Sequence, residues 1–348
     1  MGNFVPELLV NLKEKAGVSP LKKEQKRKRR SSIKKRYRQK NSRIFSGILI
    51  AALFIVLAGF IGNKGIELLI SNRIVTGHDS QSMNIDLDSL YSPYAILKDV
   101  SSDNVLGECN SRDKIYPASL TKIMTAIVAI ENTEDLEERI TLPYEIFPPL
   151  YAQNASMAGF QPGEEVSLKD LLYGIMLPSG AECCIGFARW VAGSEEQFVF
   201  LMNEKARELG MKRTHFANST GLHDPEHYST VEDISVLLEY ALKNGDFRAV
   251  FTCSRYSTHP SNEHPDGFTF YSTMFKDMDS TQVTGGEIIG GKTGYTEEAG
   301  LCLASLAQIN GKEYILVTAK ANGTHETEQF HILDAIYVYD QIGEKGAA

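Results

Sequence analysis

Cysteine is scarce in this sequence, and the five cysteines present follow no pattern that would organise a fold or a metal site. They are an odd number, and their spacings match neither a disulfide framework nor the paired ligands of a zinc site. We therefore predict neither feature. Two of them adjoin each other in an apolar stretch, which indicates small buried side chains. The five positions are Cys109, Cys183, Cys184, Cys253 and Cys302.

Basic residues are in the minority beyond the first 43 positions. Those positions hold 15 of the 36 Lys and Arg residues and three of the 44 acidic residues, which leaves 21 bases against 41 acids. Nucleic acids bind proteins largely through phosphates that Lys and Arg neutralise, so we predict no nucleic-acid partner. The basic stretch from Lys22 to Arg43 runs directly into an apolar segment, which favours a tail beside a membrane.

Charge is absent altogether from the 19 residues 44–62 (IFSGILIAALFIVLAGFIG). At about 1.5 Å per residue this segment crosses a hydrocarbon core of roughly 30 Å, so we predict one transmembrane helix. The basic side of such a helix stays in the cytoplasm, which makes residues 1–43 a cytoplasmic tail. Residues 63–90 follow as an extracellular stalk and residues 91–348 as the folded domain. A cleaved signal peptide is the alternative, although a leader of 43 residues is long for one.

The pattern of apolar residues predicts strands first, helices next, and strands with a final helix last. After Pro117, the residues Leu120, Ile123, Ile127 and Ile130 recur at helical spacing, which indicates a buried central helix. This order is typical of an α+β domain in which an antiparallel sheet packs against helices. The expected strands are 94–97, 104–106, 287–289, 301–307 and 314–319, and the other expected helices are 168–176, 182–191, 195–209, 231–243 and 328–342.

Ser119 and Lys122 form an S-x-x-K motif at the start of the central helix. Residues three apart lie on the same face of a helix, so the hydroxyl and the amine are expected to be within reach of each other. A serine hydroxyl is a poor nucleophile at neutral pH unless a base takes its proton. A buried lysine with a lowered pKa can act as that base. The motif alone is common, and its weight depends on what accompanies it.

Lys292-Thr293-Gly294 forms a K-T-G motif in the β-rich final third. On a strand, Lys292 and Gly294 point to the same side, and a glycine lets another backbone or a ligand approach closely. S-x-x-K followed by K-T-G is the signature of penicillin-binding proteins and serine β-lactamases. The signature has an S-x-N motif between the two, for which Ser179 is the candidate, on a loop between two helices. Position 181 is Ala, so the side-chain amide of that motif is missing.

The likeness extends well beyond the three motifs. The chain resembles the low-molecular-mass penicillin-binding D-alanyl-D-alanine carboxypeptidases, the serine peptidases of the S11 type, over most of residues 91–320. Several of the matching stretches have no obvious chemistry, so they support the resemblance independently of the catalytic motifs. The stretches are YPASLTKIMTA, GFQPGEEVSLKDLLYGIMLPSGAE, FVFLMNEKARELGMKRTHFANSTGLHDPEHYSTVEDIS and GGKTGYTEEAG.

This resemblance implies a β-lactamase/transpeptidase-like α+β fold and removal of the terminal D-alanine from peptidoglycan stem peptides. Carried over by position, Ser119 is the nucleophile that becomes acylated, Lys122 is the general base, and Ser179 is a proton relay. No cofactor is implied. The implied substrate ends in D-Ala-D-Ala, and penicillin and other β-lactams are implied as covalent inhibitors. The setting would be the outer face of a bacterial cell membrane.

The same resemblance implies the groups that hold the substrate. Lys292, Thr293 and Gly294 would bind the terminal carboxylate end of the peptide. The backbone N–H groups of Ser119 and Tyr295 would form an oxyanion hole, where fixed donors stabilise the negative charge of the tetrahedral intermediate. The alanine in the S-x-N position removes one substrate contact, so the positioning of the acyl chain and the rate are expected to differ.

A zinc peptidase is the first alternative, because carboxypeptidases of this specificity can also be zinc enzymes. His223 and His227 are four residues apart, but Pro225 between them breaks any helix that would align them as ligands. Acidic neighbours indicate a solvated loop there. His259 and His264 stand among Ser, Asn and Pro residues and are interpreted in the same way. No metal site is predicted.

Two further alternatives remain. A serine β-lactamase shares the acylation step but needs a base for rapid deacylation, for which Glu164, Glu165 and Glu182 are candidates. A non-catalytic or slow penicillin-binding wall protein is suggested by the alanine in the S-x-N position. The intact pair of Ser119 and Lys122 argues against a protein without activity.

Overall fold

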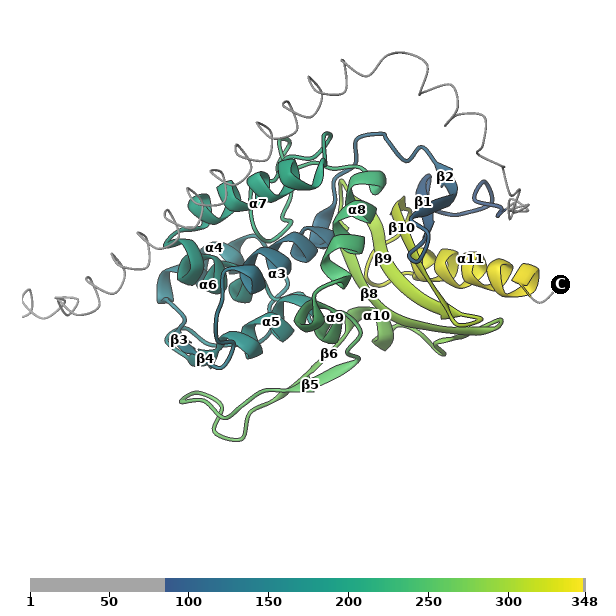
Figure 1. Cartoon of the computed structure of the whole chain (residues 1–348). Coiled ribbons are helices and arrows are strands. Elements are labelled where there is room, and N and C mark those ends of the chain that lie inside the picture. Colours follow the sequence, from purple (N-terminus) through teal and green to yellow (C-terminus); the bar gives the residue numbers. More distant parts are fainter. Residues whose placement is uncertain (1–84, 347–348) are drawn as a thin grey trace, which may run out of the picture. The chain divides into compact units, whose positions relative to one another are not determined.

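The computed structural model describes residues 85–346, and its centre is a six-stranded antiparallel sheet. The strand order is β2-β1-β10-β9-β8-β7, so the opening hairpin pairs with the last strand of the chain (Figure 1). This arrangement confirms the predicted antiparallel sheet, although the strands are longer than predicted. They are β1 (Tyr94–Asp99), β2 (Asn104–Cys109), β7 (Gln282–Val283), β8 (Gly286–Thr296), β9 (Gly300–Ile309) and β10 (Lys312–Ala321).

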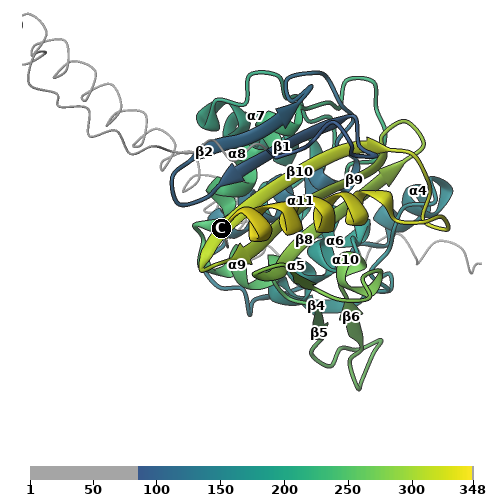
Figure 2. The same ribbon diagram turned by 90° about the vertical axis from the view of Figure 1, so that its right-hand side faces the viewer.

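Helices cover both faces of this sheet. On one face, α11 (Phe330–Gly346) lies across β9 and β10, as Figure 2 shows. The larger helical group is on the other face, and its central member is α3, in which every residue from Thr121 to Ile130 is buried. The burial of both faces explains why the middle residues of β9 and β10 are mostly apolar and buried. The helical group comprises α3 (Thr121–Glu131), α5 (Leu168–Met176), α6 (Ala181–Ala192), α7 (Glu195–Leu209), α8 (Val231–Leu242) and α9 (Gly245–Phe251).

Local chemistry fixes where these helices begin and end. The Ser167 hydroxyl accepts a hydrogen bond from the N–H of Asp170 at 3.0 Å and so caps α5. Ser194 and Thr230 cap α7 and α8 in the same way. Gly210 ends α7 in the left-handed conformation that glycine adopts without strain. The predicted helices 168–176 and 195–209 are confirmed to the residue, and the other predicted helices agree within a few residues at each end.

Several short elements were not apparent from the sequence. Most of them lie along one side of the helical group, where they are too short to show a periodic apolar pattern. The hairpin β5–β6 connects α9 to the sheet and protrudes below the other elements in Figure 1. The elements are η1 (Ala118–Leu120), β3 (Arg139–Thr141), η2 (Tyr144–Ile146), α4 (Phe147–Ala152), β4 (Glu165–Ser167), β5 (Arg255–Ser257), β6 (Thr269–Tyr271) and α10 (Thr273–Lys276).

Residues 85–90, at the end of the predicted stalk, pack on α11. Ile85 and Leu87 are buried in the same apolar layer as α11, and the N–H of Asp86 donates to Gln341 Oε1 at 2.8 Å. The predicted cytoplasmic tail, the predicted transmembrane helix 44–62 and the rest of the stalk lie outside the described residues. Within residues 85–346, none of the helices is sufficiently long and apolar to span a bilayer.

Candidate active site

Ser119 and Lys122 lie together at the start of the central helix, as their spacing predicts. Ser119 belongs to the short helix η1, and Lys122 is the second residue of α3. The distance between Lys122 Nζ and Ser119 Oγ is 3.1 Å, which is a hydrogen bond. The pair therefore has the geometry that proton transfer from the hydroxyl to a neutral amine requires.

Two glycines from distant segments of the chain lie in close contact with the backbone around Ser119. Ala118 has a φ of +45°, an uncommon conformation for a residue with a side chain. A Cβ atom on Gly221 would lie 2.0 Å from the Ala118 carbonyl oxygen, so only glycine fits there. A Cβ atom on Gly294 would lie 3.0 Å from the Ser119 nitrogen. The K-T-G strand β8 thus lies directly beside the backbone of Ser119.

Lys122 is buried, and its surroundings favour the neutral amine. Its Nζ donates to the Thr220 carbonyl oxygen at 2.5 Å as well as to the Ser119 hydroxyl. Burial lowers the pKa of Lys122, although the nearby Cys184 and Glu182 oppose this change. A lowered pKa increases the fraction of free amine at neutral pH, which is the form that accepts a proton.

Lys292 is a second buried lysine, on β8, and its side chain is fully inaccessible to solvent. Its Nζ donates to the Thr293 carbonyl oxygen at 2.9 Å. Burial and the neighbouring positive charge of Lys122 hold the pKa of Lys292 well below its ordinary value. The Thr293 hydroxyl shares a hydrogen bond of 2.6 Å with that of Thr273 on α10. The ring of Tyr295 packs edge-on against His325, with centroids 4.8 Å apart.

Among the described residues, strand β8 has a strand neighbour on only one edge over most of its length. Its neighbour β9 pairs with residues 286–296, whereas β7 pairs only with Gly286 and Glu287. Lys292 and Gly294 are buried, so this edge is unpaired but not exposed there. An unpaired strand edge can bind an extended peptide through main-chain hydrogen bonds. The K-T-G motif falls on that edge, where a substrate would meet the serine.

Ser179 lies in the predicted place, on the loop between α5 and α6. It is buried and has a φ of +68°, and its hydroxyl has no hydrogen-bond partner among the described residues. The following helix, α6, packs on α3, the helix of Lys122, and its residues Cys184 and Glu182 oppose the lowering of the Lys122 pKa. Ala181, the first residue of α6, is also buried, and its side chain carries no amide.

His227 contributes to the site in a way that the sequence did not suggest. The prediction of a solvated loop is wrong for this residue, because its side chain is buried. Its Nδ1 accepts from the N–H of Ala217 at 3.1 Å, so Nε2 carries the proton and donates to Thr121 Oγ1 at 2.7 Å. Burial lowers the pKa of His227 to about 4 and keeps the ring neutral at neutral pH. His227 thereby ties the segment before Thr220 to the helix of Lys122.

Glu164, His259 and His264, three further candidates from the sequence, lie away from Ser119 in the sequence and have other partners. Glu164 is fully buried and accepts hydrogen bonds from Ser261 Oγ at 2.5 Å and from His264 Nδ1 at 2.9 Å. His259 lies 3.2 Å from an oxygen of the buried Asp170. These pairs attach the loop between β5 and β6 to the helical group. Within residues 85–346, no three His, Cys, Asp or Glu side chains are arranged to hold a metal ion.

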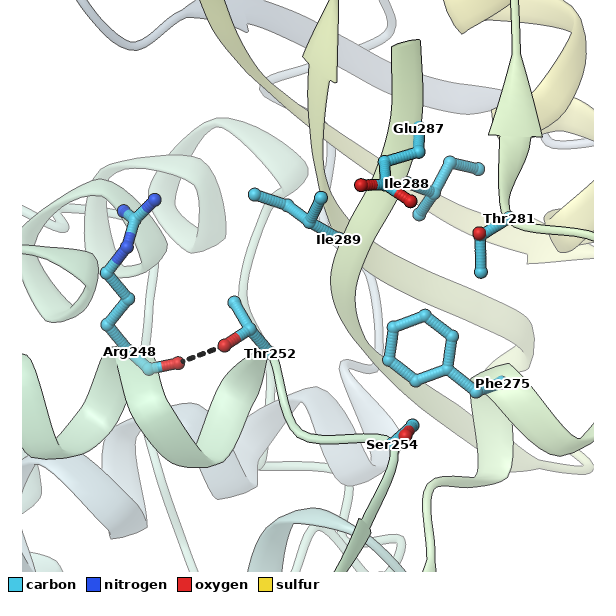
Figure 3. A pocket seen from close by; sticks show the side chains of 8 residues that line it. All are labelled: Arg248, Thr252, Ser254, Phe275, Thr281, Glu287, Ile288 and Ile289. Atoms are coloured by element: carbon cyan, nitrogen blue, oxygen red, sulfur yellow. Dashed lines mark hydrogen bonds between the residues drawn. The ribbon is translucent and has the colours of Figure 1, made fainter.

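An open pocket of about 470 Å³ lies beside the N-terminal half of β8 (Figure 3). No predicted site residue lines it. Arg248 on its rim forms an ion pair with Glu313, and the Arg248 carbonyl oxygen accepts from Thr252 Oγ1 at 2.9 Å. The lining residues are Arg248, Thr252, Ser254, Phe275, Thr281, Glu287, Ile288 and Ile289.

Comparison with known proteins gives a consistent picture. The family model described as D-alanyl-D-alanine carboxypeptidase, Peptidase_S11, matches residues 81–323. The chain is 34% identical over 238 residues to the D-alanyl-D-alanine carboxypeptidase DacF of Bacillus subtilis, covering 67% of this chain and 58% of the relative. It is 37% identical over 148 residues to DacC of Escherichia coli, with 41% and 37% covered. It is 30% identical to a D-alanyl-D-alanine endopeptidase of Pseudomonas aeruginosa, with 71% and 75% covered. The chain therefore spans less than two thirds of DacF and DacC.

Solved structures share the fold. The crystal structure of the Streptomyces K15 DD-transpeptidase has a TM-score of 0.65 and 25% identity, covering 73% of this chain and 97% of that one. A D-alanyl-D-alanine carboxypeptidase from Mycobacterium tuberculosis has a TM-score of 0.62 and 23% identity, covering 72% and 90%. The predicted α+β fold of the transpeptidase type is thus confirmed for the described domain.

Proposed function

The chain belongs to the peptidase S11 family of D-alanyl-D-alanine carboxypeptidases, and on that premise we propose that it removes the terminal D-alanine from peptidoglycan stem peptides. The observation that carries the proposal is the hydrogen bond of 3.1 Å between Lys122 Nζ and Ser119 Oγ, made by a lysine that burial drives toward its neutral form. A nucleophile with an adjacent base is the requirement for an acyl-enzyme mechanism.

The first half of the reaction forms an ester. Lys122 takes the proton of Ser119 as the hydroxyl oxygen attacks the carbonyl carbon of the penultimate D-alanine. The backbone N–H groups of Ser119 and Tyr295 stabilise the resulting oxyanion. Ser179 relays a proton to the nitrogen of the departing D-alanine as the peptide bond breaks. The second half repeats these steps with water, which releases the shortened peptide and restores the serine.

The K-T-G motif on β8 is proposed to bind the terminal carboxylate of the substrate. Lys292 and Thr293 hold the terminal carboxylate, while the reacting carbonyl lies near Tyr295. A peptide bound in this way runs antiparallel to β8, with Gly294 providing the close approach beside Ser119 that its missing side chain allows. A β-lactam carries a carboxylate and a strained amide at comparable positions, and it acylates the same serine.

We expect the purified domain to release D-alanine from a peptide ending in D-Ala-D-Ala and to form a lasting adduct with benzylpenicillin. Mass spectrometry of the intact protein measures the adduct, and an amino-acid assay measures the release. Water should clear the peptide adduct quickly, whereas the bulky penicilloyl group should persist. Rapid clearance of both adducts would identify a β-lactamase. A stable adduct without any release of D-alanine would identify a penicillin-binding wall protein without peptidase activity.

The proposed enzyme is anchored in the cell membrane by residues 44–62. The proposal is supported by the uncharged length of this segment and by the basic residues that precede it. The substrate supports the same orientation, because a wall peptide is reached only from the outer side. Residues 1–43 are then cytoplasmic, and the catalytic domain is extracellular.

A protease added to intact cells should therefore degrade the catalytic domain and spare the N-terminal tail. The measurement uses one epitope tag at each end of the chain, followed by immunoblotting. Permeabilised cells provide the control, in which both tags should be lost. Protection of the C-terminal tag in intact cells would reverse the orientation, and release into the medium of a domain that carries only the C-terminal tag would indicate cleavage after the apolar segment.

A further inference from the structure

Glu182 is a buried carboxylate to which the proposed acylation steps assign no role. It is the second residue of α6, three positions after Ser179, and its side chain is fully inaccessible to solvent. Carboxylates are seldom buried completely unless other groups compensate for the lost hydration.

One oxygen of Glu182 joins two segments of the chain. Oε1 accepts hydrogen bonds from the N–H of Ala158 at 2.7 Å and from the N–H of Gly159 at 3.0 Å. A third contact joins the same segments, because the N–H of Ala181 donates to the Ser156 carbonyl oxygen at 2.8 Å. The segment 156–159 is thereby fixed against the first turn of α6.

These contacts enclose the Ser179 turn. A Cβ atom on Gly180 would lie 2.6 Å from the Ala158 Cβ and 3.0 Å from Glu182 Oε2, so the turn, segment 156–159 and the carboxylate are in close contact. Ser179 has the left-handed φ of +68°, which costs free energy and persists only where the surroundings impose it. The carboxylate of Glu182 is the group that links those surroundings.

The other oxygen is directed at no donor. Glu182 Oε2 is buried and has no hydrogen-bond partner among the described residues, so no donor compensates this part of the negative charge. Burial raises the pKa of Glu182 to about 7, against the lowering effect of the backbone donors. Glu182 and Lys122 are both buried, and their helices α6 and α3 pack on each other, so the charge of the carboxylate opposes the lowering of the Lys122 pKa. The titratable groups around this pair are Cys183 and Cys184 on α6, Lys292 on β8 and His227, with Asp170 and Glu195 facing the two thiols.

We propose that Glu182 is a positioning residue, which holds the Ser179 turn through the N–H groups of Ala158 and Gly159. Its negative charge also favours the protonated form of Lys122, so Lys122 must lose its proton in spite of this charge. The inference rests on the proposed acylation of Ser119. It assigns Glu182 neither a contact with the substrate nor the role of a deacylating base.

Glu182→Gln separates the two parts of this role. The amide oxygen can still accept from Ala158 and Gly159, but the charge is gone. Acylation requires neutral Lys122, and without the opposing charge Lys122 loses its proton at lower pH. The acid limb of the acylation rate with benzylpenicillin should therefore move by about one unit toward lower pH. The melting temperature should stay near that of the wild type, because the hydrogen bonds are kept.

Glu182→Ala removes both parts and leaves two buried N–H groups without an acceptor. On the plateau above the acid limb its acylation rate should fall at least about tenfold, with a lower melting temperature, and its acid limb should move to lower pH as in Glu182→Gln. Glu196→Gln is the matched control, since Glu196 occupies the same position in the first turn of α7 but is exposed. Its pH profile should match that of the wild type.

The outcomes distinguish a failure of the proposed function from a failure of the inference about Glu182. An acid limb that does not move in Glu182→Gln would overturn the electrostatic role, and wild-type acylation in Glu182→Ala would overturn the positioning role. If the wild-type protein forms no adduct with benzylpenicillin at any pH, the proposed function fails first. Normal wild-type acylation with an unaltered Glu182→Gln profile would reject only the inference about Glu182.

Discussion

Ser119→Ala should abolish both the benzylpenicillin adduct and the release of D-alanine. The substitution removes the oxygen that attacks the carbonyl and leaves Lys122 with its other acceptor, the Thr220 carbonyl oxygen. Loss of a nucleophile that acts together with its base reduces turnover by on the order of 10⁴-fold or more. Intact-protein mass spectrometry after incubation with benzylpenicillin measures this directly.

The fold should survive this change. Ser119 is only partly buried, and its hydroxyl makes one hydrogen bond, to Lys122. Removing such a bond costs about 1 kcal/mol, which circular dichroism and thermal unfolding would register as a small shift. Ser101→Ala, on an exposed turn, is a control that should acylate at the wild-type rate. A normal adduct in Ser119→Ala would show that another residue is the nucleophile.

The sequence predicted most of the fold because the large elements follow simple periodic patterns. The helix 195–209 begins with a serine cap and ends at a glycine, and both signals can be read without a structure. Strands β9 and β10 appeared shorter in the sequence than they are. Their ends contain the polar residues Lys312, Glu313 and Gln308, which lie at the more exposed ends of the strands and interrupt an apolar run.

The site was predictable where its chemistry is concentrated in short motifs. Spacing alone places Ser119 and Lys122 on one helical face, and the structure has the two side chains within hydrogen-bond distance. The K-T-G motif could be assigned to a strand, but its position beside Ser119 could not. That contact joins residues 119 and 294, and it depends on the pairing of β8 with the rest of the sheet.

The remaining site residues escaped prediction because their importance arises from long-range contacts. Thr220 acts through its carbonyl oxygen, which any residue would supply, so its identity carries no signal. His227 appeared to lie in a polar loop, and its contacts with Thr121 and Phe216, which accompany its burial, could not be inferred from the sequence. Glu182 was considered as a base for deacylation, whereas its hydrogen bonds to Ala158 and Gly159 could not be inferred from any pattern.

Lys122→Arg should be as inactive in acylation as Lys122→Ala. A guanidinium group keeps the positive charge but does not lose its proton in proteins, so it cannot act as a base. A general base contributes about 10²–10⁴-fold, and both variants should lose a factor of this size in the rate of adduct formation. In the wild type the rate should rise with pH as Lys122 becomes neutral. Because burial lowers the pKa of Lys122, this rise should occur below the ordinary range of lysine, which is about 10.4.

The comparison of the two variants separates a base from a fixed positive charge. If Lys122 served only to stabilise charge, Lys122→Arg would retain much of the wild-type rate while Lys122→Ala would lose it, which would contradict the proposed mechanism. Both variants should also lose the rise of the rate with pH, since the titrating amine is gone. Lys169→Arg is a suitable control, because Lys169 is half exposed on α5 and pairs with Glu137 at 3.0 Å. Its pH profile should match the wild type, so that a change confined to Lys122 can be attributed to the loss of the base.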